Sequence, residues 1–449
     1  MSHRVRSQGV FVLIALVVTA AVQAQQFVIP DTPAGHVLSA FMEAFNSGDR
    51  ARMQTYHDTY DAKTMSVDVM VGFRSQTGGF DVLAINKSEP LRIEYLVKER
   101  ASATRALGVL EVIGADAAKV ASSTLRVLPP GSVDPPNFDI DAVTRDRVIN
   151  GAIAKLNESY VYADLAKKMA QTLRRHEKSG VYKGIKNGDE FAALVTRHLL
   201  EVAHDKHLRV NFSPVKLPDF AAAPAPQQME DNRKRYERNN CLFTKVEILP
   251  GNVGYVKVNG FGPPDVCAPT AIAAMNFVAD VDAIIFDLRD NNGGDPAMVS
   301  FLASYLFDRP THLNDLYTRK TNETRQFWTE AHVPGKCLGP APAFVLTSSR
   351  TFSGGEEFAY DLQTQKRATI VGETTGGGAH PVHGEKIDDR FLIAVPFARA
   401  INPITKTNWE GTGVTPDVRV PEADALTTAQ KLAADKLAAP PGAPRSAGQ

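Results

Sequence analysis

From about residue 241 onward, short apolar segments of strand length alternate with segments of helical pattern, and this alternation is the strongest constraint on the fold. "DAIIFDLR" (282–289) is typical of a buried strand, "PAMVSFLASYLF" (296–307) of a helix, and "AFVLTSS" (343–349) of another strand. Strands separated by helices predict α/β layers around a largely parallel sheet. We therefore expect an α/β core over residues 241–425.

Residues 31–130 carry a different pattern. The segment "HVLSAFMEAFNSGD" (36–49) predicts an amphipathic helix whose apolar face holds Leu38, Phe41, Met42 and Phe45. Strand-like segments follow, and "RIEYLV" (92–97) alternates as a half-buried strand should. Helical sequence followed by a run of antiparallel strands predicts a small α+β domain.

Within this domain, "AFNSGD" (44–49) and "TGGFDVL" (77–83) also resemble the cone-shaped SnoaL-like domains. That resemblance implies a scaffold or a binding appendage. His36 and His57 lie in the same region, but we find no catalytic constellation around them.

Composition divides the remainder of the chain. "LPPGSVDPP" (128–136) predicts a linker, and residues 138–212 show helical patterning that ends in a short strand. The Pro/Ala-rich sequence within 213–240 predicts a mobile connection or a surface lid. Residues 426–449 form a tail, and its end is disordered by composition.

The first 24 residues have the pattern of a secretory signal peptide, with a basic start, an apolar run from Val10 to Val22 and small residues before a cleavage point after Ala24. A membrane anchor is the alternative, but the run is short and no stop-transfer flank follows it. We therefore expect an exported chain without stable membrane insertion after cleavage. In a cell with two membranes its location would be the periplasm.

Charge and cysteine content narrow the partners and the redox state. Lys+Arg and Asp+Glu both number 50, so no global field recruits nucleic acid or an anionic membrane. Three cysteines permit at most one intramolecular disulfide. Cys241 with Cys267 is the favoured pair because both flank one predicted strand and its turn, and reduced thiols are the alternative. The oligomeric state is left open.

The segment "RTFSGGEEFAY" (350–360) places Ser353 at a strand-to-helix turn. Such a turn lifts a side chain to the edge of a sheet, and the helix dipole favours negative charge there. The N–H group of Gly354 would point to where an oxyanion forms. Serine is also a common helix N-cap, so the turn alone leaves a structural role open.

A second turn, "DLRDNNGGDP" (287–296), follows another buried strand. Its paired glycines, Gly293 and Gly294, allow outward-facing N–H groups that suit an oxyanion or a carboxylate. Tight packing in an ordinary strand–helix turn is the alternative. The G-x-G-x-x-G and P-loop patterns are absent, which excludes those nucleotide-binding motifs.

Serine catalysis needs a base, and His207 in "HDKHLRV" (204–210) is the best candidate, although a partly buried structural histidine fits equally well. Glu410 in "NWEGTGVTPDV" (408–418) would orient and charge-balance that base. A metal interpretation is weaker because no strong metal motif is present. It would use His204, Asp205, His207, His380 and His383.

Together with "VGETTGGGAHP" (371–381), these elements resemble the tail-specific, C-terminal processing peptidases. Within that family the chain is most similar to the branch of tricorn core domains and interphotoreceptor retinoid-binding protein modules. The resemblance covers roughly residues 140–425. It implies a crotonase/ClpP-like β-β-α core and serine peptidase chemistry that needs no cofactor and no metal.

The resemblance assigns a role to individual positions. Ser353 matches the nucleophile, His207 the general base and Glu410 the distal acid, while Gly354 and Gly293 match the oxyanion donors.

Some positions depart from the family pattern. Gly378 stands where Ser-Lys dyad enzymes carry lysine, and Lys206 stands where tricorn-type sites carry serine. Glu356 matches a glutamate of the dyad enzymes, and we interpret it as structural. No PDZ-like insert is found.

These observations predict an exported serine peptidase that acts on peptides or unfolded proteins. A non-catalytic binding module for apolar molecules such as retinoids or fatty acids is the main alternative, and a metal hydrolase is the third. We expect segment 213–232 to cover the cleft beside His207 and to favour short, flexible peptides. Arg325 and Trp328 in "TRKTNETRQFW" (318–328) would form the opposite wall.

Overall fold

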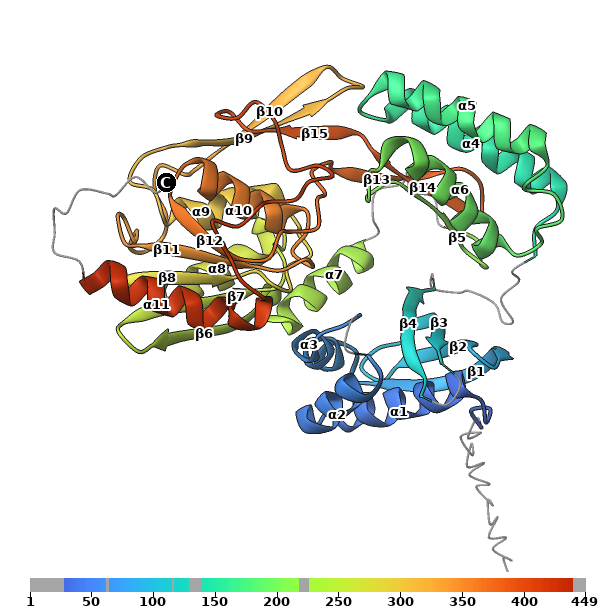
Figure 1. The fold of residues 1–449 in the computed structure, drawn as a ribbon, viewed down its shortest axis with the longest axis horizontal. Helices are drawn as coiled ribbons and strands as arrows, with labels where there is room; N and C mark the ends of the chain where they lie inside the picture. Colours follow the sequence, from blue (N-terminus) through green and yellow to red (C-terminus); the bar gives the residue numbers. More distant parts are fainter. Residues whose placement is uncertain (1–27, 62–63, 115–116, 129–138, 218–225, 439–449) are drawn as a thin grey trace, which may run out of the picture.

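The computed structural model describes residues 28–61, 64–114, 117–128, 139–217 and 226–438. The predicted signal peptide, most of the predicted linker 128–136 and the end of the tail lie outside the described residues. Across the described ranges, no helix has both the length and the apolar character of a membrane span. The described chain forms an N-terminal domain, a helical unit and a large α/β core (Figure 1).

The N-terminal domain packs three helices on one face of a four-stranded antiparallel sheet in the order β1-β2-β3-β4. The first helix begins after Thr32, whose hydroxyl accepts the Gly35 N–H group, and it buries Leu38 and Phe45 against the sheet. The elements are α1 (Pro33–Ser47), α2 (Arg50–Tyr60), α3 (Val67–Thr77), β1 (Phe80–Glu89), β2 (Arg92–Glu99), β3 (Arg105–Ile113) and β4 (Lys119–Val127).

The helical unit is completed by residues from the far end of the sequence. Strand β5 pairs antiparallel with β14, so the hairpin of β13 and β14 joins the unit that we expected within 138–212 (Figure 1). Phe191, Phe212 and Phe391 share its hydrophobic cluster. The elements are α4 (Ala142–Ser159), α5 (Ala163–Ser179), α6 (Gly188–Ala203), β5 (Arg209–Phe212), β13 (Val382–Lys386) and β14 (Phe391–Pro396).

The core is built on a six-stranded sheet in the order β16-β12-β11-β8-β7-β6, parallel except for β6. This agrees with the largely parallel sheet predicted from the alternating pattern. The elements are β6 (Phe243–Leu249), β7 (Val253–Val258), α8 (Pro264–Phe277), β8 (Ala283–Asp287), α9 (Pro296–Ser304), β11 (Ala343–Thr347), α10 (Gly354–Thr364), β12 (Ala368–Gly372), β16 (Val418–Arg419) and α11 (Ala425–Ala438).

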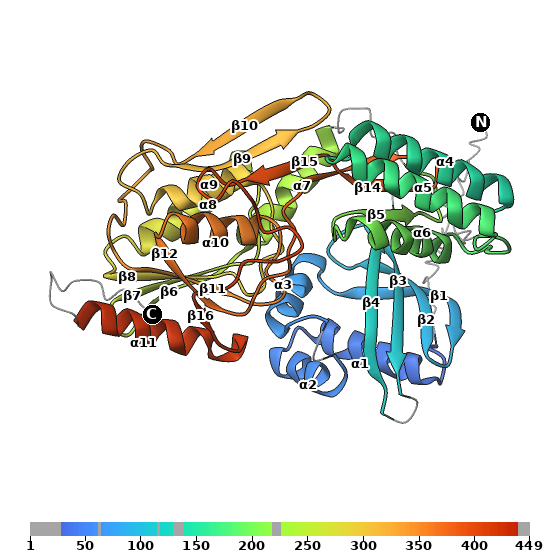
Figure 2. The ribbon, with the colours of Figure 1, turned by 45° about the horizontal axis from the view of Figure 1, so that its top comes forward.

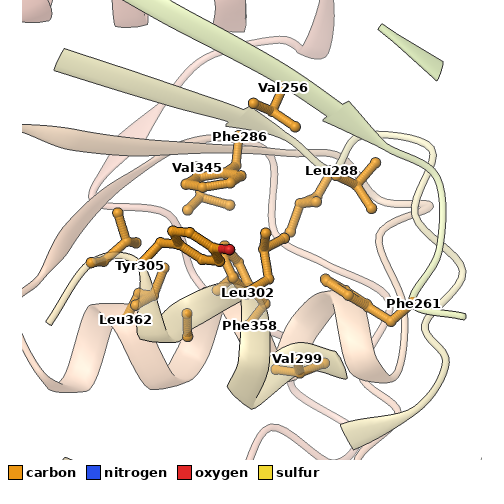
Figure 3. Close-up of a cluster of buried hydrophobic side chains, with 14 of the residues drawn as sticks. Val256, Phe261, Phe286, Leu288, Val299, Leu302, Tyr305, Val345, Phe358 and Leu362 are labelled. Atoms are coloured by element: carbon orange, nitrogen blue, oxygen red, sulfur yellow. The ribbon is translucent and has the colours of Figure 1, made fainter. Parts of the chain in front are cut away.

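Both faces of this sheet are covered, and successive strand residues serve opposite faces. Phe286 and Val345 pack with Phe358 in the cluster under α8, α9 and α10 (Figure 3). Their neighbours Ile285 and Phe344 pack against α11 on the other side (Figure 2). Because both faces are buried, the strands read as continuous apolar runs rather than as alternating ones.

A smaller sheet, β10-β9-β15, stands beside the core, with β9 (His312–Thr318), β10 (Glu323–Trp328) and β15 (Ala398–Ile401). Cys241 and Cys267 form the predicted disulfide, with their Cα atoms 5.4 Å apart, and Cys337 is a free thiol.

Residues 218–225 of the expected linker or lid lie outside the described residues, and its described parts are more ordered than their composition suggested. Val215 and Leu217 are buried, and the Leu217 N–H group donates to Asp389 O. The charged second half of the segment forms α7 (Pro226–Arg238). Helix-favouring charged residues after the Pro/Ala stretch explain this difference.

Charged side chains join the N-terminal domain to the core. Lys257 of β7 is buried, and its Nζ lies 2.6 Å from Asp68 Oδ2 of α3 and 2.9 Å from Asp290 Oδ2. Arg350 binds Asp290 at 2.9 Å from the other side and also pairs with Glu422. Asp290 and Arg350 belong to the two turns that we singled out in the sequence.

Candidate active site

Ser353 lies at the tight turn between β11 and α10. Its φ of 54° and ψ of −121° fall in the left-handed region that non-glycine residues rarely adopt. Such a conformation costs about 1–3 kcal/mol and persists only where the surroundings impose it. The strained turn raises the Ser353 side chain at the carboxyl end of a central parallel strand, which is the geometry of a nucleophile elbow.

Glu356 imposes this turn from inside the helix. Its Oε2 accepts the Ser353 N–H at 2.9 Å and the Gly378 N–H at 2.8 Å, while Oε1 accepts the Gly377 N–H at 2.6 Å and the Thr375 hydroxyl. Burial raises the pKa of Glu356, and the donated hydrogen bonds oppose that shift. Glu356 therefore ties the Ser353 turn to the glycine-rich loop.

The paired glycines lie directly against Ser353. Gly293 has a φ of 99°, and a Cβ atom there would lie 2.6 Å from Ser353 Cβ, so only glycine fits. However, the Gly293 N–H already donates to Asn291 Oδ1 at 2.8 Å. Among the described residues, the N–H groups of Gly354 and Gly294 have no acceptor. The structure thus leaves Gly294, rather than Gly293, with a free N–H beside Gly354.

His207 follows the turn that ends α6 and precedes β5. Its ring packs against Phe352, the neighbour of Ser353, with the ring centroids 4.7 Å apart. Burial lowers the pKa of His207, while the negative charge of Asp205 opposes this shift. A neutral imidazole packed on Phe352, the residue before Ser353, is suited to accept a proton. No hydrogen bond between Ser353 Oγ and His207 is formed within the described part of the chain.

The absence of a side chain at Gly378 leaves room for the imidazole of His207. A Cβ atom at Gly378 would lie 2.6 Å from His207 Cε1 and closer still to the Phe352 ring. The imidazole therefore occupies the space that a side chain at position 378 would need. Lys206 points elsewhere, since its Nζ donates to Gly376 O at 2.6 Å.

Glu410 does not reach His207 directly. Its Oε2 accepts the Ala379 N–H at 2.6 Å and lies 3.4 Å from His380 Nδ1. The carboxylate that faces His207 is Asp205, whose Oδ1 lies 3.9 Å from His207 Nδ1 and accepts its backbone N–H at 3.0 Å. From the sequence, Asp205 and His380 were considered only as metal ligands, and the spacing of Asp205 two residues before His207 is the local signal that links them.

Two groups of side chains bring together potential metal ligands among the described residues. In the first, Asp205 Oδ2 and His380 Nδ1 are 2.7 Å apart, which matches a direct hydrogen bond between them. In the second, on α5 and α6, the His176 and His198 rings stack at 3.6 Å and 10°. An ion lies near the plane of each imidazole that binds it, and two parallel stacked rings offer no such shared point.

Arg325 and Trp328 lie on β10, the edge strand of the smaller sheet. The Arg325 guanidinium packs on Phe327, and Trp328 stacks on His312 while staying half-exposed. No contact within the described residues connects either side chain to Ser353 or His207. The contacts of Arg325 and Trp328 with their neighbours on the small sheet therefore do not test their predicted role as a wall of the substrate cleft.

Residues 252–420 match the model of Peptidase family S41. The chain is 27% identical over 189 residues to carboxyl-terminal-processing peptidase 2, chloroplastic, of Arabidopsis thaliana, covering 41% of this chain and 36% of that protein. It is 29% identical over 186 residues to the carboxyl-terminal-processing protease of Picosynechococcus sp., covering 41% and 43%.

Among solved structures, the photosystem II D1 C-terminal processing protease aligns with a TM-score of 0.40 and 15% identity, covering 63% of this chain and 94% of that one. The chain spans less than half of the length of the two relatives matched by sequence.

Proposed function

We propose that the protein is an exported serine-type peptidase that hydrolyses peptide bonds, on the premise that residues 252–420 match the model of Peptidase family S41. The observation that carries the proposal is Ser353, held in a strained turn between the paired glycines and the Phe352–His207 contact. We further propose a crotonase/ClpP-like core, a SnoaL-like N-terminal domain and cleavage of the signal peptide after Ala24.

In this proposal His207, neutral because burial lowers its pKa, accepts the proton of Ser353 Oγ as that oxygen attacks the peptide carbonyl. The N–H groups of Gly354 and Gly294 stabilise the oxyanion, and each donor contributes about 3 kcal/mol. His207 then delivers its proton to the leaving amine. Water then attacks the acyl carbonyl while giving a proton to His207. His207 returns that proton to Ser353 Oγ as the ester bond breaks and the acid product leaves.

The substrate class follows from the family and from the predicted walls of the cleft. The relatives are named for carboxyl-terminal processing, so we propose peptides or unfolded proteins processed near their ends. Residues 213–232 are proposed to restrict access, and Arg325 and Trp328 to contact an extended peptide on the exposed strand β10.

The test is the Ser353→Ala variant. The matched control is Ser349→Ala, which lies in the same segment between β11 and α10. Ser349 is exposed, so its loss should leave the turn intact. We expect Ser353→Ala to abolish labelling by a fluorophosphonate probe and to reduce peptide turnover by about 10⁶-fold without change in folding. Full turnover by this variant would refute the proposal. A wild-type protein that resists the probe and binds a fatty acid or retinoid tightly would favour the binding module.

A further inference from the structure

A series of acids and imidazoles extends from His207 through Asp205 and His380 to Glu410. We infer that Asp205 is the carboxylate that positions His207, and that His380 and Glu410 in turn position Asp205. This inference rests on the proposed peptidase function, and it changes which acid serves the base. Asp205, His380 and Glu410 act as positioning residues, because none of them touches Ser353.

The first step is the contact between Asp205 and His207. Asp205 is 1% exposed, and its Oδ1 accepts the backbone N–H of His207 at 3.0 Å. The same oxygen lies 3.9 Å from His207 Nδ1, a buried ring nitrogen without a hydrogen-bond partner among the described residues. A small rotation of the imidazole would bring Nδ1 within hydrogen-bond range. Catalytic hydrogen bonds are often long without substrate and shorten in the complex.

The second step concerns the other oxygen of Asp205. Oδ2 lies 2.7 Å from His380 Nδ1 and 3.5 Å from the Tyr160 hydroxyl, both of which donate to it. A carboxylate this deeply buried needs such partners, because an unpaired buried charge is costly. With Oδ2 held in this way, Oδ1 stays directed toward His207.

Glu410 completes the series at its far end. Its Oε2 is fixed by the Ala379 N–H and faces the Nδ1 edge of His380, so it holds the ring that holds Asp205. Burial, and then the nearby charge of Asp205, raise the pKa of Glu410 to about 7. Glu410 is not among the groups that act directly on His207, so it influences the imidazole through Asp205, which it meets both directly and by way of His380.

The charges around His207 give the sign of the effect. The charged and titratable groups that face its ring are Asp205, which favours the imidazolium, and His380 and Arg209, which oppose it. Removing the charge of Asp205 therefore lowers the pKa of His207 and destabilises the imidazolium that forms during catalysis. Removing the charge of Glu410 leaves the Asp205–His207 contact in place.

The experiment compares Asp205→Asn with Glu410→Gln, two substitutions that preserve shape and remove one charge each. The readouts are the rate of Ser353 labelling by a fluorophosphonate and kcat/KM on a fluorogenic peptide, both from pH 5 to 9. We expect Asp205→Asn to slow both by about 10³-fold with KM unchanged, and to shift the acid limb of the pH profile downward. Glu410→Gln should lower the labelling rate and kcat/KM by less than about 10-fold, and the acid limb of its pH profile should stay near that of the wild type.

His380→Gln gives an independent variant should Asp205→Asn fail to fold, and we expect an intermediate loss from it. The inference is overturned if Glu410→Gln loses as much activity as Asp205→Asn, or if Asp205→Asn labels like the wild type. Labelling that a chelator abolishes and zinc restores would also overturn it, in favour of a metal held by Asp205, His380 and Glu410. A wild-type protein that fails to label would overturn the proposed function itself, and the inference with it.

Discussion

Replacing Gly378 by alanine adds one methyl group at the point where the glycine-rich loop meets the proposed base. A Cβ atom there would lie 2.6 Å from His207 Cε1 and closer still to the Phe352 ring. The φ angle of Gly378 is not in the left-handed region, so alanine meets no backbone restriction and the effect is steric alone. The substitution therefore tests the packing of His207 and Phe352 against this loop without changing the chemistry of the imidazole.

The magnitude follows from the size of the overlap. Ordinary van der Waals contact for a Cβ atom begins at 3.4 Å, so the imidazole must retreat by about 0.8 Å. Misplacement of a catalytic group by about 1 Å costs about 10²-fold in rate, which corresponds to about 2.7 kcal/mol in the activation barrier. Overpacking of this kind also lowers the free energy of unfolding by about 1–3 kcal/mol.

The assay is peptide turnover and Ser353 labelling at pH 8, with thermal unfolding measured on the same samples. Gly384→Ala in β13 is the matched control, because its Cβ would meet only Leu392 Cδ1 at 3.7 Å. We expect Gly378→Ala to lose about 10²-fold in kcat/KM while Gly384→Ala behaves like the wild type. A Gly378→Ala variant with wild-type turnover would refute the placement of His207 against this loop.

Two further predictions concern stability. The folded state holds the pKa of Glu410 at about 7, above its ordinary 4.5, so its contribution to stability is present below pH 4.5 and is lost as the pH rises to 7. The free energies of unfolding of the wild type and Glu410→Gln, measured in urea, should therefore diverge by up to about 3 kcal/mol between pH 4.5 and 7. If the two free energies change in parallel with pH, the raised pKa of Glu410 is contradicted. Reducing the Cys241–Cys267 disulfide, which joins residues 26 apart, should cost about 3 kcal/mol in a melting experiment, while Cys337→Ser should change little.

Features set by neighbouring residues could be predicted from the sequence. The largely parallel sheet followed from runs such as "DAIIFD", because a strand buried on both faces must be apolar throughout. The turn at Ser353 followed from its position between an apolar strand and a glycine-led helix. The disulfide followed from two cysteines that flank one strand.

Features set by distant residues could not be predicted in this way. Asp205 and His380 are 175 positions apart and meet only because β5 pairs with β14 across the helical unit. The family pattern pointed to Glu410 as the acid, and nothing local to "NWEG" indicates that His380 stands between it and Asp205. The hydrogen bond from Gly293 to Asn291 is a detail of one turn, and it decides which glycine N–H is free.

The buried Lys257 has a consequence for the modularity of the chain. Its ammonium group forms ion pairs with Asp68 of the N-terminal domain and with Asp290 of the core. These two carboxylates are 222 residues apart in the sequence. Loss of the N-terminal domain would therefore uncover a lysine that the core shields only on one side.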